Sequence, residues 1–221
     1  MGELKQVGSL WVPAADKKIR PDHPFYGDMP DLDVSKAAKA LEFCSSFDMA
    51  LDVGAYVGAV TLLLAQRFDK VVAFEAIPET FEALKANAGR LPNVTLQPLA
   101  VSDRPMELYF EHLPRFGQLS HGLRQEDAHS ATTIGPIQAV SLDSFGFDKV
   151  SFIKIDVEGL EPEVIEGAKD MILRCRPTIL IEQGNPGESH PRDRASEQLE
   201  EMGMTRVEEF DFRRDRVYRF A

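Results

Sequence analysis

The sequence has few cysteines, no long apolar run and no surplus of positive charge. Its two cysteines, Cys44 and Cys175, have a spacing that fits neither a disulfide framework nor a metal site. The run VTLLLA at 60–65 is far shorter than a membrane-spanning helix. The N-terminus shows no basic segment followed by an apolar one, which a secretory signal would need. We therefore predict a cytoplasmic protein with reduced thiols and no membrane partner.

Acidic residues outnumber basic ones. Asp and Glu number 36 against 25 Lys and Arg, which gives a formal net charge of −11. This charge argues against nucleic acid as the main partner, because phosphate binding needs a basic surface. Basic residues do gather at 211–219, but they alternate with acids, which is typical of a solvated face. We expect a small-molecule partner, and the sequence leaves a homo-oligomer open.

From residue 33 onward, apolar strand-like runs alternate with helical patterns. Such alternation predicts an α/β fold with a mostly parallel sheet and helices on both faces. The length suits one domain, so we expect an irregular N-terminal arm at 1–32 and a single domain at 33–221. The predicted strands are 49–55, 70–77, 93–102, 149–158, 176–183 and a terminal antiparallel hairpin, and the predicted helices are 34–46, 58–68, 78–88, 161–173 and 192–203.

The segment 103–149 breaks this rhythm. Strand patterns at 105–113 and 137–145 flank a polar, turn-rich stretch that contains His121. A loop as long as 113–136 is unusual in a compact domain, and such loops are often functional. We expect this loop and the N-terminal arm to cover a ligand, with the aromatic residues Trp11, Phe25, Tyr26 and Phe116 either lining its site or packing.

The stretch LDVGAYVGAVTLLLAQRF at 51–68 places Asp52, Gly54 and Gly58 between a buried strand and a helix. In open α/β sheets, ligands bind beyond the carboxyl ends of the strands. Gly54 permits unusual backbone angles, and Gly58 allows close helix packing or a close ligand. A dinucleotide fingerprint needs glycine where Tyr56 stands, because a side chain there would crowd a pyrophosphate. The turn therefore favours a cofactor without phosphates, with a purely structural turn as the alternative.

Glu75 ends the second strand of this region, 21 residues after Gly54. An acid at that distance can accept hydrogen bonds from the 2′- and 3′-hydroxyls of a nucleoside cofactor. Asp52 would stand near an amino-acid moiety and receive its ammonium directly or through water. Together these features favour S-adenosylmethionine (SAM). An NAD-binding oxidoreductase and a non-catalytic, partner-binding domain that retains the fold are the alternatives.

Five motifs, LDVGAYVGAVTLLLA, VVAFEAIPETFEALKANA, LAVSD, VSLDSF and FIKIDVEGLEPEVIEGAKDMI, resemble the FkbM-type family of SAM-dependent methyltransferases. The resemblance runs from about 49 to 183. It implies a class I methyltransferase fold, with a seven-stranded sheet and an antiparallel last strand, and methylation of hydroxyl groups on natural products or sugars. Tyr56 and Ala76 depart from the family, which usually has Asn and Pro there. The residues assigned to SAM are Asp52, Gly54, Ala55, Tyr56, Gly58, Glu75, Ala76, Ala100, Asp103 and Asp156.

The motif IKIDVEG puts charged side chains in a strand that should be buried on both faces. Alternation places Lys154, Asp156 and Glu158 on one face and the apolar residues on the other. A buried lysine requires a partner, and Asp52 and Glu182 are the neighbours that the usual strand order predicts.

A hydroxyl acceptor must lose its proton during methyl transfer. We expect the general base to be Asp156, Glu158 or His121. We predict no metal, with a divalent cation on Asp156, Glu158 or Glu182 as the alternative. The sequence therefore predicts a SAM-dependent methyltransferase that acts on a hydroxyl of a small molecule or saccharide.

Overall fold

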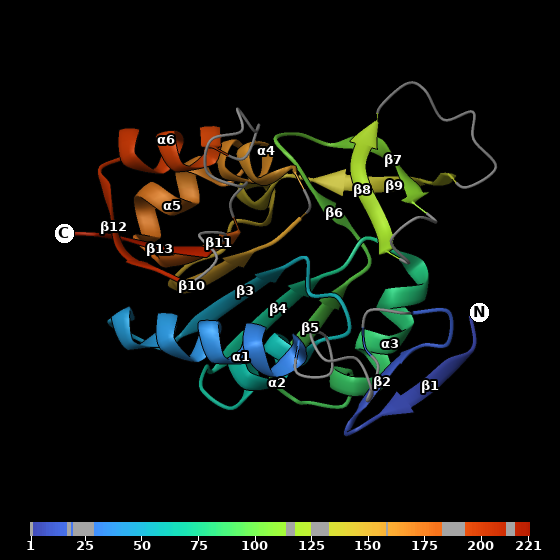
Figure 1. Cartoon of the computed structure of the whole chain (residues 1–221). Helices are drawn as coiled ribbons and strands as arrows, with labels where there is room; N and C mark the ends of the chain where they lie inside the picture. The colour runs from blue at the N-terminus through green and yellow to red at the C-terminus, as the bar shows by residue number, and fades with distance from the viewer. Residues whose placement is uncertain are drawn as a thin grey trace.

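The computed structural model describes residues 2–16, 19, 29–113, 118–124, 133–157, 159–182, 193–210 and 215–221. A seven-stranded sheet runs through the centre in the order β12–β13–β11–β10–β3–β4–β5 (Figure 1). Its strands are β3 (Met49–Val53), β4 (Lys70–Phe74), β5 (Val94–Gln97), β10 (Val150–Ile155), β11 (Thr178–Glu182), β12 (Met204–Glu209) and β13 (Asp215–Phe220).

Strand direction in this sheet agrees with the prediction. β13 runs antiparallel to its neighbours β11 and β12, and the pairs among β11, β10, β3, β4 and β5 are parallel. Parallel neighbours need crossover connections, which the intervening helices supply. The predicted α/β class with a mostly parallel sheet and an antiparallel last strand is confirmed.

Helices cover both faces of the sheet (Figure 1). One face carries α1, α2 and α3, and the other carries α4, α5 and α6. Two short 3₁₀ helices, η1 (Leu41–Phe43) and η2 (Leu142–Phe145), precede β3 and β10. The α-helices are α1 (Met29–Ala40), α2 (Ala59–Ala65), α3 (Pro78–Ala88), α4 (Glu161–Glu166), α5 (Lys169–Cys175) and α6 (Asp193–Glu201).

Successive residues of β10 face the two helix layers in turn. Ile153 and Ile155 belong to the cluster that α4, α5 and α6 share, and Val157 packs against it. Phe152 belongs to the cluster under α1 and α2. Because side chains alternate along a strand, Lys154 lies on the Phe152 side. A lysine thus stands among the apolar residues of this layer.

The N-terminal arm is not irregular throughout, as the sequence had suggested. β1 (Leu4–Val7) and β2 (Leu10–Pro13) form an antiparallel hairpin, with Gly8 at the turn in a left-handed conformation (φ 59°). The hairpin packs on α3, where Asn87 donates to the Trp11 carbonyl and accepts from its N–H, both at 2.8 Å. These contacts tie the N-terminus to the helix that follows β4.

Two helices differ from their predicted extents. α1 spans Met29–Ala40 instead of 34–46, so Asp33 lies inside the helix. The helix predicted at 161–173 is divided into α4 and α5 around Gly167, where a Cβ atom would lie 2.1 Å from the Ser102 carbonyl oxygen. The close backbone of Ser102 thus accounts for glycine at the break.

The segment between β5 and β10 forms a second, four-stranded sheet in the order β6–β9–β7–β8 (Figure 1). The strand predicted at 93–102 is split at Pro98, so that its two halves join different sheets. The loop predicted at 113–136 contains a strand and the start of another, which corrects the expectation of a continuous loop. The strands are β6 (Ala100–Val101), β7 (Met106–Leu113), β8 (Gln118–Arg124) and β9 (Thr133–Val140).

Across the described part of the chain, the helices are too short or too polar to span a bilayer.

Candidate active site

The glycine turn lies between β3 and α2, against the end of β4. The N–H groups of Gly54 and Ala55 both donate to the Phe74 carbonyl, at 3.0 and 2.9 Å. The Gly58 N–H donates to the Ala55 carbonyl at 2.9 Å, which closes the turn. These bonds place the turn at the carboxyl edge of the sheet, where open α/β folds bind ligands.

Packing explains both glycines of the turn. A Cβ atom on Gly54 would lie 1.8 Å from the Asp156 carbonyl oxygen, and Gly54 has a φ of 79°. A Cβ on Gly58 would lie 2.7 Å from Cδ1 of Leu84 in α3, and its φ is 92°. Close helix packing, one of the two roles considered for Gly58, is therefore observed.

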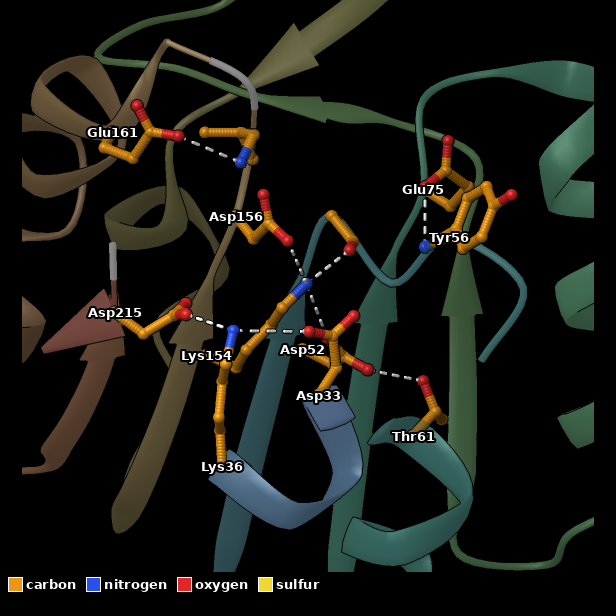
Figure 2. A network of polar contacts seen from close by, with 12 residues as sticks. Asp33, Lys36, Asp52, Tyr56, Thr61, Glu75, Lys154, Asp156, Glu161 and Asp215 are labelled. Carbon is orange, nitrogen blue, oxygen red and sulfur yellow. Dashed lines mark hydrogen bonds and ion pairs between the residues drawn. The ribbon is translucent and has the colours of Figure 1, made fainter. Parts of the chain in front are cut away.

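Glu75 follows β4 and faces the turn (Figure 2). Its Oε2 accepts from the Tyr56 N–H and its Oε1 from the Ile77 N–H, both at 2.8 Å. Burial raises the pKa of Glu75 to about 7, while the two backbone donors act to lower it. Each carboxylate oxygen has a second lone pair, so both can still accept from a ligand hydroxyl. The side chain is 7% exposed.

Lys154 reaches across from β10 to the turn and to β3 (Figure 2). Its Nζ donates to the Gly54 carbonyl at 2.6 Å. The same atom lies 3.7 Å from Oδ1 of Asp52 and 3.6 Å from Oδ2 of Asp156. Burial acts to lower the pKa of Lys154, but the carboxylates around it, Asp156 and Asp52 foremost, raise it overall. The predicted pairing of Lys154 with Asp52 is confirmed, and Asp156 is a second partner.

Asp52 is fully buried, so it lies behind the surface of the site. Its Oδ2 accepts from the Thr61 hydroxyl at 2.6 Å, and its Oδ1 faces Lys154. A carboxylate held in this way cannot directly contact an ammonium of a ligand. Thr61, on the first turn of α2, is a site residue that sequence reasoning missed.

A small cleft lies between α1 and the ends of β10, β11 and β13. Lys36 of α1 forms an ion pair with Asp215 at the start of β13, and Asp33 lies 3.7 Å from Lys36. Sequence reasoning missed Lys36 and Asp215 as site residues. Only the i, i+3 spacing of Asp33 and Lys36 could have indicated them. The charged side chains of the lining are Asp33, Lys36, Lys154, Asp156 and Asp215.

Asp156 stands at the open end of β10, next to further acids. Carboxylate oxygens of Asp156, Glu161 and Glu182 lie within 4.8 Å of one another. Oε1 of Glu161 accepts from the N–H groups of Val157 and Gly159, both at 3.2 Å. Glu161 thereby orders the segment between β10 and α4. Sequence reasoning had expected Glu182, but not Glu161, at this edge.

The remaining predicted cofactor contacts fall in two places. Ala100 belongs to an apolar cluster with Ile77, against which Ala76 packs, so both alanines lie near the end of β4. Asp103 accepts from Arg104 at 2.8 Å and lies beside Gly167. The structure therefore brings Ala76 and Ala100 together and places Asp103 next to the end of α4.

Several predicted residues fall outside the described part of the chain. Glu158 is among them, as are the aromatic residues Phe25, Tyr26 and Phe116. His121 lies in β8, but its side chain is not described. Of the predicted aromatic lining, Trp11 is described, and its side chain is 41% exposed on the N-terminal hairpin.

Comparison with known proteins now adds to this geometry. The sequence profile of the methyltransferase FkbM domain matches residues 52–219, which is most of the chain. This chain belongs to the FkbM methyltransferase family. The match begins at Asp52 and runs through the glycine turn, Glu75 and the IKIDVEG motif to β13. The resemblance noted from the motifs is thereby confirmed.

Individual relatives agree with this assignment. The hexuronic acid methyltransferase AglP of Haloferax volcanii is 32% identical over 129 residues, which cover 58% of this chain and 52% of AglP. The chain thus spans about half the length of that relative. The methyltransferase FkbM of Methylobacillus flagellatus has a similar fold, with a TM-score of 0.52 and 16% identity over 79% of this chain and 44% of that one.

A third comparison concerns Aeropyrum pernix fibrillarin, whose crystal structure contains natively bound SAM. It superimposes with a TM-score of 0.51 and 12% identity, covering 85% of this chain and 74% of fibrillarin. At such identity the similarity establishes the fold alone. The predicted class I methyltransferase fold is confirmed.

Proposed function

We propose that this protein is a SAM-dependent O-methyltransferase and that its acceptor is a saccharide. The observation that carries the proposal is the position of Glu75, which lies beyond the carboxyl end of β4, with Oε2 bonded to the Tyr56 N–H of the glycine turn and Oε1 to the Ile77 N–H. Membership of the FkbM methyltransferase family supports it. The proposed catalytic domain is 33–221, with the preceding residues as an arm.

The residues around the turn fit SAM. Glu75 would accept hydrogen bonds from both ribose hydroxyls through its remaining lone pairs. Ala76, which packs against the apolar cluster that contains Ala100, would lie beside the adenine ring. Gly54, Ala55, Tyr56 and Gly58 would provide the backbone against which the nucleoside lies. Asp52 would act through Lys154, because Asp52 itself is buried.

When bound, SAM supplies a methyl group that is already activated by a sulfonium. The protein must then align the acceptor oxygen and remove its proton. Among the candidates for the general base, Asp156 is the one whose side chain the structure describes. That side chain is 35% exposed and borders the cleft. Lys154 forms an ion pair with it at 3.6 Å, which holds the carboxylate at the border of the cleft. Glu158 and His121 remain candidates for the same role.

The saccharide acceptor is proposed from the relative and from the cleft. AglP is a hexuronic acid methyltransferase, and 32% identity over 129 residues supports a related acceptor. The cleft is bordered by the carboxylates of Asp33, Asp156 and Asp215, which can accept from hydroxyls. Acceptors of this kind suit the hydroxyls of a saccharide.

Isothermal titration calorimetry with SAM and NAD tests the cofactor. We expect SAM to bind and NAD to bind much more weakly, because Tyr56 occupies the position of the second glycine in a dinucleotide fingerprint. Binding of NAD without binding of SAM would favour the oxidoreductase instead.

Transfer of labelled methyl groups tests the acceptor. A panel should compare free and glycosidically linked hexuronic acids with the matching neutral hexoses. We expect transfer to the hexuronic acids. Transfer to the neutral sugars alone would retain the methyltransferase and reject the uronic acid. Binding of SAM with no transfer to any member would favour a non-catalytic domain.

A further inference from the structure

Tyr56 has a backbone conformation that bulky residues rarely adopt. Its φ is 52°, in the left-handed region, which Asn enters far more readily than Tyr. Tyr56 is also where the chain departs from the Asn that the FkbM family usually has. A residue in such a conformation needs surrounding contacts that hold it there. The structure provides these contacts at both ends of the residue.

The backbone and the side chain of Tyr56 bind different carboxylates. Its N–H donates to Oε2 of Glu75 at 2.8 Å (Figure 2). Its phenol donates to Oδ2 of Asp16, in the segment that follows the N-terminal hairpin. Tyr56 therefore connects the acid at the end of β4 to a carboxylate 40 residues earlier in the chain.

Asp16 is itself fixed in place. It is 5% exposed, and its carbonyl accepts from Nζ of Lys5 at 2.7 Å. Its Oδ1 accepts from the Ile19 N–H at 3.3 Å, which leaves Oδ2 directed to the phenol. Leu10, Val12 and Ile19 form an apolar cluster against which Tyr56 packs. The acceptor for the phenol is thus preorganised by the hairpin and its neighbours.

We propose that Asp16 is a positioning residue of the cofactor site, which holds Tyr56 so that the Tyr56 N–H orients Glu75 for the ribose hydroxyls. This inference rests on the proposed use of SAM. In this role Asp16 would act through Tyr56 and not on the cofactor directly. In other family members, Asn would favour the left-handed backbone conformation by itself. Here the Asp16–Tyr56 bond holds Tyr56 in that conformation.

The test is SAM affinity, measured by calorimetry on the full chain. Tyr56→Phe removes only the phenol oxygen and should weaken SAM binding about fivefold or more, as expected for loss of a charge-assisted hydrogen bond. Asp16→Ala should have a similar effect. Both variants break the Asp16–Tyr56 bond, and Asp16→Ala also removes the acceptor of the Ile19 N–H. If the shared bond accounts for the effect, Asp16→Ala should change the affinity far less in the Tyr56→Phe background than in the wild type.

Tyr56→Asn provides the rescue. Asn adopts the left-handed conformation without a partner, so this variant should bind SAM more tightly than Tyr56→Phe does. Gln6→Ala, in the exposed part of the hairpin, is the matched control and should leave the affinity unchanged. Thermal unfolding of each variant shows whether it folds. If Asp16→Ala does not fold, the SAM affinities of the two Tyr56 variants still test the positioning role.

The outcomes separate this inference from the proposed function. Wild-type protein that fails to bind SAM overturns both. Wild-type binding that survives Tyr56→Phe and Asp16→Ala unchanged overturns the positioning role alone. The positioning role is also overturned if Tyr56→Asn binds SAM no more tightly than Tyr56→Phe does. It is overturned likewise if Asp16→Ala weakens SAM binding as much in the Tyr56→Phe background as in the wild type.

Discussion

Lys154 and Asp52 form an ion pair across two adjacent parallel strands, with Nζ of the lysine 3.7 Å from Oδ1 of the aspartate. The two residues are register partners in β10 and β3, and both are buried in the layer under α1 and α2. The ion pair is therefore part of the buried core as well as part of the candidate active site.

Replacing Lys154 by Met should destabilise the fold by about 3–5 kcal/mol, because it leaves the buried carboxylate of Asp52 without its counter-charge. Urea denaturation measures the change. Adding Asp52→Asn should recover part of the loss, since the amide can still accept from Thr61. A loss below about 1 kcal/mol for Lys154→Met would show that the pair contributes little.

SAM affinity should rise with pH as Glu75 ionises. Burial raises its pKa to about 7, and the groups that face it are Asp52, which raises the pKa, and Lys154, which lowers it. The pKa values of Tyr56 and Lys154 are both raised, so neither group loses its proton in the same range. Between about pH 6 and 8 the ionised fraction increases nearly tenfold, and the affinity should follow.

Glu75→Gln provides the control for this pH dependence. The amide cannot accept at both positions and does not ionise, so the variant should bind SAM weakly at every pH. Calorimetry in buffers of matched ionic strength measures both proteins. A wild-type affinity that is flat across this range would mean that ionisation of Glu75 is not linked to binding.

Gly54→Ala should be among the most damaging single substitutions in the chain. The new methyl group would meet the Asp156 carbonyl oxygen, and the residue would keep a φ of 79°. We expect a loss of about 4 kcal/mol or more, or failure to fold. Gly203→Ala is the matched control, because its φ is 87° and a Cβ there meets no atom within 4 Å. It should cost about 1–2 kcal/mol. Similar losses for the two would refute the steric argument.

Asp156→Asn should separate catalysis from cofactor binding. If Asp156 removes the acceptor proton, kcat should fall by about 10²–10⁴-fold while the SAM dissociation constant stays within a few-fold of wild type. His121→Ala, measured in parallel, should retain most of the activity. If His121→Ala loses activity and Asp156→Asn retains it, His121 of β8 removes the proton. A large loss of SAM affinity in Asp156→Asn would make Asp156 a cofactor ligand.

Periodicity was sufficient to predict the central sheet. The apolar alternation of Ile153, Ile155 and Val157 reflects a real buried face, and the charged face opposite correctly indicated paired groups. The distance from Gly54 to Glu75 likewise follows from one strand–helix–strand unit. These features depend on residues that are close together in the sequence, so the sequence of this one protein is enough to predict them.

Long-range contacts account for what the sequence did not reveal. The split between α4 and α5 depends on the backbone of Ser102 and on Asp143, whose carboxylate accepts from the N–H groups of Asp170 and Met171 at 3.0 and 2.8 Å. The contacts of Asp16 and Lys36 with the site depend in the same way on tertiary packing. The N-terminal hairpin does have a local signal, a Gly8-Ser9 pair between the short segments LKQV and LWVP.

The second sheet begins and ends at neighbouring points. β6 pairs in parallel with the last residues of β9, through Ala100 with Ala139 and Val101 with Val140. The two ends of the segment between β6 and the end of β9 are therefore held side by side by this pairing. Changing the length of the segment adds little to the entropy cost of loop closure. Evolution or an engineer could lengthen or shorten the strands between these two points while both attachments to the seven-stranded frame stay in place.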